Sequence, residues 1–369
     1  MKTVLISGAS VAGLTAAHWL RSKGYAPTVV ECAPALRPGG HALDVRGVAL
    51  DVLDRMGLLE EARRVRTRMR GTTMLDAEGN ELWRSPGTRL GGDRSGGGDI
   101  ALLRDDLTRL LYGPTRDDVE YVFGDSLSAL GQDREGVHVS FERGRPRTFD
   151  LVVGADGLHS EVRRLAFGAE RRFVRHLGRH LAVFSADNFL GLDDWQVWMR
   201  DETARYCLYP ARDNTETRAT LGFASGPLDH DHRAVEDQKS LVAERLCHLR
   251  WETPKLLAAM RTAPDFYFDA MARVRMRTWS AGRVVLIGDA GHCPSSMSGQ
   301  GAGPALVGAY VLADELGRAG DDHRAALTRY EARMRTYAEP DRAPTTADPA
   351  GSAPEEPLER AGNAIALDA

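Results

Sequence analysis

The chain has 369 residues, of which 43% are hydrophobic and 27% charged, and its formal net charge is −4. This length exceeds the size at which one hydrophobic core usually keeps growing, so two domains are expected. The arginines are scattered among acidic residues, which argues against nucleic acid as a partner. The four cysteines show no CxxC or paired spacing, so we expect a reducing, cytoplasmic compartment, no disulfide framework and no metal site. No apolar run is long enough for a signal peptide or a membrane span, so no membrane partner is expected.

The chain begins with a pattern typical of dinucleotide binding. A short apolar run predicts a first strand, and the glycine turn GASVAG follows it and opens a helix. Gly8 permits the tight bend, Gly13 permits close packing of helix on strand, and Ser10 stands where a middle glycine would approach a pyrophosphate. A second predicted strand ends at Glu31, whose carboxylate can accept hydrogen bonds from both hydroxyls of an adenosine ribose. The alternative is an ordinary glycine turn of some other α/β domain.

Two arginines and an aspartate are further candidates for contact with a ligand. Arg37 and Asp44 flank a pair of glycines, a combination typical of a loop that wraps a ligand, although a solvated connection explains the composition equally well. Arg104 stands near the start of a predicted helix, where a cation opposes the helix dipole at a cost of about 0.3–1 kcal/mol unless an anion lies close by. Arg104 is therefore a candidate ligand contact, with a surface ion pair to a neighbouring aspartate as the alternative.

Two later strands each run into an acidic turn. The first turn has the sequence GADG and contains Asp156, and the second contains Asp289. After the second turn, a loop of small residues leads into another predicted helix and includes Gly299, Gly301 and Ala302. Small residues allow a flat or phosphorylated ligand to approach the backbone, and the amides at a helix start can receive negative charge. The stretch therefore predicts a ligand site.

Residues 172–275 differ from the rest of the chain. Strand-like pieces surround one helical segment, and three of the six tryptophans lie here. We expect an antiparallel sheet with a wall of aromatic side chains. Four of these side chains are candidates for lining an apolar substrate pocket, with simple core packing as the alternative for each: Trp195, Trp198, Tyr206 and Phe223. Tyr209 is a further candidate with the same alternative.

Taken together, three motifs resemble the flavin-dependent aromatic hydroxylases. They are the first glycine turn with its downstream acid, the GADG turn, and the GD turn followed by the GQGA loop. The family comprises the single-component monooxygenases related to para-hydroxybenzoate hydroxylase and the tetracycline-inactivating monooxygenase. The resemblance covers nearly the whole chain. It implies FAD as cofactor, NADPH or NADH as a transient co-substrate, and O2. It also implies that a flavin hydroperoxide hydroxylates an aromatic or polyketide-type small molecule.

The resemblance also implies roles for the residues singled out above. The ADP half of FAD would be held by the first motif: Gly8, Ser10, Gly13 and Glu31. Other portions of FAD would be contacted by Asp44, Arg104, Asp156, Asp289 and the backbone from Gly299 through Gly301 to Ala302. In this assignment Asp289 meets the ribityl–pyrophosphate portion, and the backbone segment lies against the isoalloxazine. Asp156 would also meet the nicotinamide cofactor, and Arg37 the phosphate-bearing end of NADPH.

We therefore expect an α/β fold with a Rossmann-like FAD-binding domain that is discontinuous in sequence, a second, antiparallel-sheet substrate domain and a C-terminal helix. The FAD-binding domain is predicted to comprise residues 1–70, 96–171 and 276–320. The substrate domain is predicted to comprise residues 71–95 and 172–275. Residues 321–369 would form a helical segment and an irregular tail, and a monomer or homodimer is expected.

Because a flavin would carry the chemistry, no acid–base triad is required. His292 and Cys293 lie in the second acidic turn, where packing roles are expected and roles as base or nucleophile are the alternative. Two other functions stay open. The pair Trp195 and Trp198 resembles the tryptophan motif of flavin halogenases only superficially, since the spacing differs. A flavin-binding protein without turnover, acting in sequestration or regulation, is the second alternative.

Overall fold

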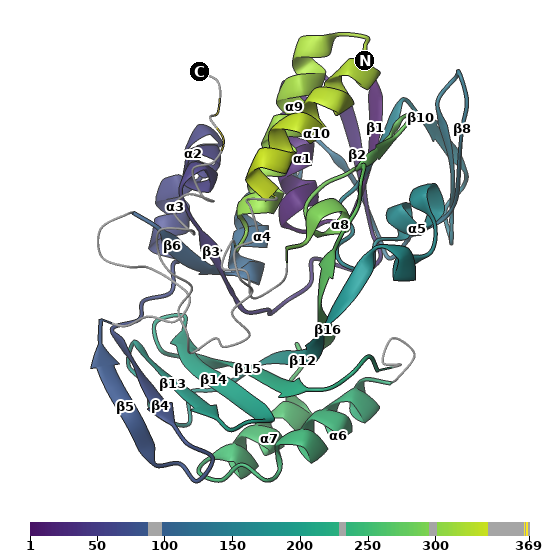
Figure 1. The fold of residues 1–369 in the computed structure, drawn as a ribbon. Coiled ribbons are helices and arrows are strands. Elements are labelled where there is room, and N and C mark those ends of the chain that lie inside the picture. The colour runs from purple at the N-terminus through teal and green to yellow at the C-terminus, as the bar shows by residue number, and fades with distance from the viewer. Residues whose placement is uncertain (88–97, 229–233, 295–300, 339–364, 366, 368–369) are drawn as a thin grey trace.

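A computed structural model describes residues 1–87, 98–228, 234–294, 301–338, 365 and 367. The described residues form an upper and a lower layer in Figure 1, each built on one large sheet. In the upper layer helices cover a mostly parallel sheet, and in the lower layer a pair of helices covers a mostly antiparallel sheet. The predicted α/β class, with a Rossmann-like sheet and a second antiparallel sheet, is confirmed.

The first sheet has six strands in the order β17-β18-β11-β1-β2-β7. They are β1 (Thr3–Ser7), β2 (Ala26–Glu31), β7 (Glu120–Phe123), β11 (Leu151–Gly154), β17 (Ser280–Ala281) and β18 (Val284–Leu286). Neighbouring strands pair in parallel except for β17, which is antiparallel to β18. Val4, Leu5 and Ile6 are all fully buried, as expected for a parallel strand that is covered on both faces.

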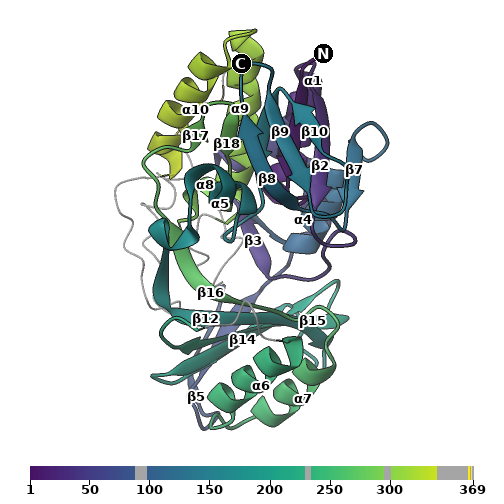
Figure 2. The same ribbon diagram turned by 90° about the vertical axis from the view of Figure 1, so that its right-hand side faces the viewer.

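Helices and a small sheet cover both faces of this parallel sheet (Figure 2). The helices of this layer are α1 (Val11–Ser22), α2 (Val48–Arg55), α3 (Leu59–Arg64), α4 (Arg104–Tyr112), α5 (Glu161–Phe167), the 3-10 helix η1 (Glu170–Arg172), α8 (Asp289–His292), α9 (Gly303–Ala319) and α10 (His323–Ala338). The remaining strands are β8 (Leu127–Gln132), β9 (Val137–Phe141) and β10 (Arg147–Phe149) in one sheet, and β3 (Ala42–Val45) with β6 (Ile100–Leu103) in another. α9 is buried along most of its length and packs against α1, α2 and α10.

The second large sheet has seven strands in the order β16-β12-β15-β14-β13-β4-β5. They are β4 (Gly71–Leu75), β5 (Glu81–Pro86), β12 (Val174–Asp187), β13 (Trp195–Arg200), β14 (Ala204–Ala211), β15 (Glu216–Ala224) and β16 (Tyr267–Val274). Neighbours are antiparallel except β13 and β4. The helices α6 (Val235–Leu246) and α7 (Thr253–Thr262) cover its outer face (Figure 2).

The strands of each sheet come from the segments that the sequence assigns to one domain. β4 and β5 precede residue 88, yet they join the sheet formed by residues 174–274. We therefore propose the division given above, with residues 71–95 and 172–275 in the substrate domain and residues 1–70, 96–171 and 276–320 in the FAD-binding domain. Residues 88–97 and the tail after Pro344 fall largely outside the described residues. Among the residues that the structure describes, no helix is both long and apolar enough to cross a membrane.

Candidate active site

The first glycine turn is packed too closely for any side chain at two positions. Gly8 follows β1 with φ at +105°, and a Cβ there would lie 2.5 Å from the carbonyl oxygen of Ala155. A Cβ on Gly13 would lie 1.9 Å from the carbonyl oxygen of Gly8. The turn therefore depends on glycine at both positions, and it packs directly against the GADG turn after β11.

Ser10 fits without strain where the fingerprint has its middle glycine. Its φ of −117° is accessible to any residue, and it caps α1 without a side-chain hydrogen bond to the helix. The main-chain N–H of Leu14 donates to the carbonyl of Ser10 at 2.9 Å, so the helix starts directly after the turn. The positive end of the α1 dipole therefore lies at the carboxyl edge of the parallel sheet, where a phosphate is favoured.

Glu31 joins the end of β2 to the glycine turn. Its side chain is buried, Oε2 accepts a hydrogen bond from Ala9 N at 2.8 Å, and Oε1 accepts one from Ala33 N at 2.9 Å. An ionised carboxylate has about four lone-pair sites. Cys32 Sγ also donates to Oε1, at 3.3 Å, so Oε2 is the oxygen that keeps acceptor capacity for a sugar hydroxyl.

Arg104 organises the loop that contains Arg37. Its guanidinium lies close to Gly40, and Nη2 donates to the carbonyls of Arg37, Pro38 and Gly39 at 3.4, 3.3 and 3.2 Å. Burial and this arginine lower the pKa of His41 to about 4, so the imidazole is neutral at physiological pH. The sequence left open an ion pair between Arg104 and a neighbouring aspartate. The structure instead shows hydrogen bonds from Arg104 to these main-chain carbonyls.

Arg37 itself is exposed at the rim of this loop. Its Nη2 lies 3.6 Å from the Sγ of Cys32, the residue after Glu31. An exposed guanidinium can meet a phosphate without first breaking a buried ion pair. The position is compatible with the docking role implied for Arg37, which stays a prediction.

Asp44 contacts the small-residue loop before α9 through its main chain. Ala302 N donates to the carbonyl of Asp44 at 2.8 Å, and a Cβ on Gly301, whose φ is +54°, would lie 2.0 Å from the same oxygen. The Asp44 side chain pairs with Arg46 at 2.9 Å. The structure thus brings three predicted residues together, while Gly299 lies outside the described residues.

Asp289 opens α8 directly after the parallel strand β18. Its side chain is exposed, yet surrounding protein displaces enough solvent to raise the pKa of the carboxyl group, against the effect of a hydrogen bond from Cys293. Asp289 follows the carboxyl end of β18, and ligands of parallel sheets bind at this edge. This is the environment expected of a residue in a ligand cleft.

Asp156 already has several protein partners. Its carboxylate accepts hydrogen bonds from Ser160 Oγ at 2.5 Å, Val162 N at 3.0 Å and Ser7 Oγ at 3.2 Å. Burial is the main influence on its pKa and raises it. Asp156 therefore ties β1 to the start of α5, and contact with FAD or a nicotinamide cofactor stays a prediction.

The four aromatic side chains predicted to line a pocket do not share one face of the second sheet. Trp195, Tyr206 and Phe223 pack into the core that the sheet forms with α6 and α7. Tyr206 is fully buried, and its hydroxyl lies 2.9 Å from that of Thr253. Trp198 faces the other side, because side chains alternate along a strand. For three of the four residues, core packing replaces the predicted pocket role.

The face of the sheet toward the FAD-binding domain carries Trp198 and Tyr209, which the sequence predicted as pocket candidates, and Gln196, which sequence reasoning missed. Trp198 packs there beside Tyr209, whose hydroxyl accepts a hydrogen bond from Ala42 N at 2.8 Å. Gln196 is nearly buried on the same face and donates to Thr72 Oγ1 at 2.6 Å. The alternation in β13 contained the signal, because it separates positions 196 and 198 from Trp195.

His292 and Cys293 are both packed in the protein interior. His292 is buried, its Nε2 lies 3.3 Å from Tyr330 Oη, and its ring centroid is 4.8 Å from that of Trp279. Burial lowers the pKa of His292 to about 4. Cys293 is buried, with its thiol 3.8 Å from the carbonyl of Ala272. These contacts favour the packing roles over roles as base or nucleophile.

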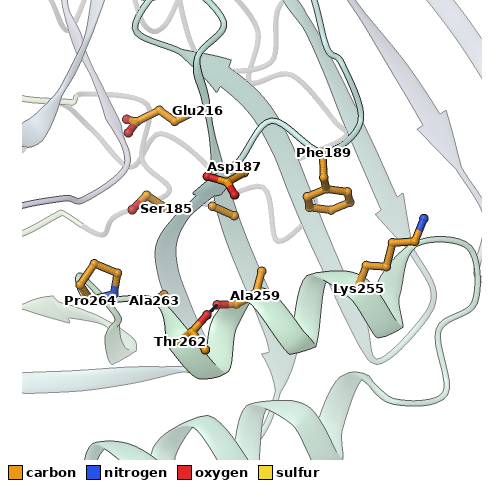
Figure 3. A pocket seen from close by; sticks show the side chains of 10 residues that line it. Ser185, Asp187, Phe189, Glu216, Lys255, Ala259, Thr262, Ala263 and Pro264 are labelled. Atoms are coloured by element: carbon orange, nitrogen blue, oxygen red, sulfur yellow. Dashed lines mark hydrogen bonds between the residues drawn. The ribbon is translucent and has the colours of Figure 1, made fainter.

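A separate pocket of about 470 Å³ lies at the end of β12 (Figure 3). Figure 3 shows Phe189, Asp187 and Lys255 around it, with Thr262 of α7 on the wall below. None of the predicted site residues lines it. It is therefore distinct from the edge of the parallel sheet at which the sequence motifs meet.

The motifs fit an extended dinucleotide. Parallel strands β1, β2, β11 and β18 all end at one edge of the sheet, and ligands of such sheets bind outside the carboxyl ends of the strands. Four residues of the predicted site lie along this edge. They are Gly8 and Gly301, where the backbone leaves no room for a Cβ, the buried carboxylate Glu31 and the carboxylate Asp289.

Comparison with known proteins agrees with this fit. A family model described as FAD binding domain matches residues 1–340. An uncharacterized protein of Mycobacterium tuberculosis is 52% identical over 339 residues, which cover 92% of this chain and 91% of the relative. A flavin-dependent monooxygenase of an unknown prokaryotic organism is 38% identical over 342 residues, covering 93% of this chain and 88% of that protein.

Solved structures give the same result. A crystal structure of a tetracycline destructase matches with a TM-score of 0.87 and 31% identity, and the match covers 100% of both chains. An FAD complex of Klebsiella pneumoniae HpxO shares the fold, with a TM-score of 0.72 and 23% identity over 92% of this chain and 87% of that one. The chain thus belongs to the family of flavoproteins defined by this FAD-binding domain, and it is an FAD-dependent monooxygenase.

Proposed function

We propose that this enzyme consumes NAD(P)H and O2 to hydroxylate an aromatic or polyketide-type small molecule. The observation that carries the proposal is the match, over the full length of both chains, to a tetracycline destructase. That name describes a protein acting on a polycyclic polyketide. A second destructase structure is 34% identical with a TM-score of 0.85, covering 100% of this chain and 99% of that one.

The chain's own residues would hold the cofactor along the edge of the parallel sheet. Glu31 would accept hydrogen bonds from the adenosine ribose, and the start of α1 at Ser10 would face the pyrophosphate. Asp289 would accept from the ribityl hydroxyls, and the backbone near Gly301 would leave room for the flavin ring. When bound, FAD would supply the electron transfer and oxygen activation that amino-acid side chains lack.

The protein would contribute orientation and exclusion of water. The face of the second sheet that carries Trp198 and Tyr209 is apolar at these positions and is turned toward the FAD-binding domain. An aromatic substrate held on such a face would be kept from bulk solvent next to the cofactor. NAD(P)H would dock transiently at exposed Arg37, because the sequence has only one glycine fingerprint.

The direct test measures NADPH and NADH oxidation by the purified, FAD-loaded protein across a panel of phenols, anthraquinones and tetracyclines. We expect at least one compound to accelerate the oxidation and to gain one oxygen atom by mass spectrometry. Light scattering on the same preparation tests whether the enzyme is a monomer or a homodimer.

Each alternative has its own result in this assay. A chlorinated product that forms only with chloride would indicate a halogenase. A yellow protein that binds FAD tightly but oxidises NAD(P)H with no compound offered would indicate a sequestering or regulatory flavoprotein. Either result would contradict the proposed hydroxylation.

A further inference from the structure

β16 is flanked by contacts with two segments that carry predicted site residues. Just before the strand, Asp265 lies so close to Gly39 that a Cβ on this glycine would be 2.3 Å from Asp265 Oδ2. At the end of the strand, Val274 N donates to the carbonyl of Cys293 at 2.9 Å, in the turn opened by Asp289. The strand therefore runs from the Arg37 loop to the second acidic turn (Figure 1).

Tyr267, the first residue of β16, is directed away from the core that the sheet forms with α6 and α7. Phe268 belongs to the core beneath α6 and α7, so Tyr267 and Asp269 lie on the opposite face. Tyr267 is 41% exposed, although surrounding protein raises the pKa of its phenol well above the usual value. The charges of Arg37 and Asp289 both act on this phenol, so it lies within electrostatic reach of two residues of the predicted cofactor site.

A chain of hydrogen bonds leads from Tyr267 to the surface. Tyr267 Oη donates to Asp269 Oδ2 at 2.6 Å, and His159 Nε2 lies 3.0 Å from Asp269 Oδ1. On the other side of the ring, His159 Nδ1 lies 3.1 Å from Glu170 Oε1. Hydrogen bonds to the two carboxylates raise the pKa of His159 to about 10. The imidazole is therefore a cation at neutral pH and donates to both partners.

This arrangement fixes the direction of the Tyr267 hydroxyl group. Asp269 is largely buried, but the hydrogen bonds from His159 and Tyr267 keep the pKa of its carboxyl below the usual value. An ionised carboxylate only accepts hydrogen bonds. Tyr267 therefore keeps its phenolic proton and donates it in the hydrogen bond to Asp269. The phenolic oxygen then presents a lone pair to a donor in the cleft.

We propose that Tyr267 accepts a hydrogen bond from a sugar-type hydroxyl group of FAD, and that His159 is a positioning residue that acts on FAD through Asp269 and Tyr267. The donors of this class in FAD are the hydroxyls of the ribityl chain and of the ribose. The substrate domain would thereby supply one contact to the cofactor. This contact would come from β16, which is an edge strand of the seven-stranded sheet. The proposal rests on the assignment of this cleft to FAD.

The test is a titration of the apo protein with FAD, followed by quenching of flavin fluorescence. Tyr267→Phe keeps the ring and removes the oxygen, so we expect FAD to bind about 3- to 10-fold more weakly, the factor of one ordinary hydrogen bond. Asp269→Asn replaces an acceptor by a group that can donate to the phenol, so a similar loss is expected. Thermal unfolding of each apo variant reports whether the fold is intact.

A double-variant cycle separates positioning from a purely structural role. His159→Gln should weaken FAD binding in the wild-type background and have no further effect in the Tyr267→Phe background. His248→Gln is the matched control, because His248 makes a comparable 2.6 Å contact with Asp201 elsewhere in the substrate domain. It should leave FAD affinity unchanged.

Three results would decide against the proposal or its basis. Unchanged FAD affinity in Tyr267→Phe would overturn the contact with Tyr267. A full effect of His159→Gln in the Tyr267→Phe background would show that His159 acts by another route. A folded wild-type protein that binds no FAD would refute the assignment of the cleft. In contrast, wild-type protein that binds FAD but hydroxylates nothing would contradict only the proposed function.

Discussion

The main-chain amide of Ala302 donates a hydrogen bond to the carbonyl oxygen of Asp44 across 2.8 Å. This contact joins β3, near the start of the chain, to the loop before α9, near its end. Gly301 lies against the same carbonyl in a left-handed conformation. The contact therefore fixes the backbone that is predicted to lie against the flavin.

Gly301→Ala should disrupt this end of the site. A Cβ at φ of +54° is strained and would also meet the Asp44 carbonyl at 2.0 Å, so we expect a loss of about 1–3 kcal/mol in the free energy of unfolding. The FAD content of the purified variant should fall as well. Urea unfolding and flavin absorbance measure the two effects. Gly131→Ala is the control, because a Cβ there meets nothing within 4 Å, and an equal loss in both variants would contradict the argument.

Glu31→Gln should weaken FAD binding by about tenfold or more. The amide keeps one acceptor oxygen, so one of the contacts with Ala9 N and Ala33 N is lost, together with a charge-assisted bond to the ribose. Fluorescence titration with FAD measures the change. Glu120→Gln alters a carboxylate on the neighbouring strand β7 and should leave the affinity unchanged. An affinity of Glu31→Gln equal to wild type would remove this residue from the site.

The His159 ion pairs should make stability depend on pH in the alkaline range. The pKa of His159 is raised from 6.5 to about 10 in the folded protein, so its contribution is fully present below pH 6.5 and is lost as the pH rises through about 10. Because the pair is partly exposed, we expect the contribution to be on the order of 1 kcal/mol. Urea unfolding of wild type and His159→Gln should show a difference that shrinks from pH 6 to pH 10. A difference that is constant with pH would be inconsistent with this ion pair.

His292 should affect stability in the opposite pH range. Its pKa is lowered from 6.5 to about 4 by burial, so the unfolded chain takes up a proton first and the folded state loses stability as the pH falls from 6.5 to 4. His292→Phe cannot take up this proton, so its free energy of unfolding should fall less steeply over that range. At pH 8 the variant should still bind FAD and turn over. Loss of turnover with FAD bound would restore a catalytic role for His292.

Tyr206 and Trp198 should behave differently when altered. Tyr206→Phe removes the contact with Thr253 in the helix-side core and should cost about 0.5–1.5 kcal/mol of stability with no change in kinetics. Trp198→Ala alters the face turned toward the FAD-binding domain and should raise KM for the substrate more than it lowers stability. Parallel measurement of unfolding and of steady-state kinetics checks the contrast. A raised KM in Tyr206→Phe would return this residue to the pocket.

Sequence patterns predicted the elements that carry local signals. The turn at Gly8 to Gly13, the acid at the end of β2 and the turn of Asp289 each combine a buried strand with a chemically marked boundary, and the structure shows all three at one edge of the sheet. Helix α10 was likewise predicted from periodicity. Such features can be read from the sequence because backbone conformation and the need for small residues are set within a few positions.

The pocket residues could not be predicted in this way. Trp195 and Trp198 are equally aromatic and belong to one strand, but they face opposite sides of the sheet. Which face meets the FAD-binding domain depends on where α6 and α7 pack, and that is set by burial across the whole sheet.

The amino-acid sequence was thus sufficient for the fold class, the family resemblance and the dinucleotide motif, because these depend on short-range patterns of glycine, acid and apolar residues. The tertiary structure was needed to show three contacts. Ala302 N donates to the carbonyl of Asp44, Arg104 donates to the carbonyls of the Arg37 loop, and Tyr267 Oη donates to Asp269. The first two contacts join segments far apart in the chain, whereas Tyr267 and Asp269 are two residues apart on β16. The partners of Asp44 and Arg104 are set by tertiary packing, which no local pattern encodes.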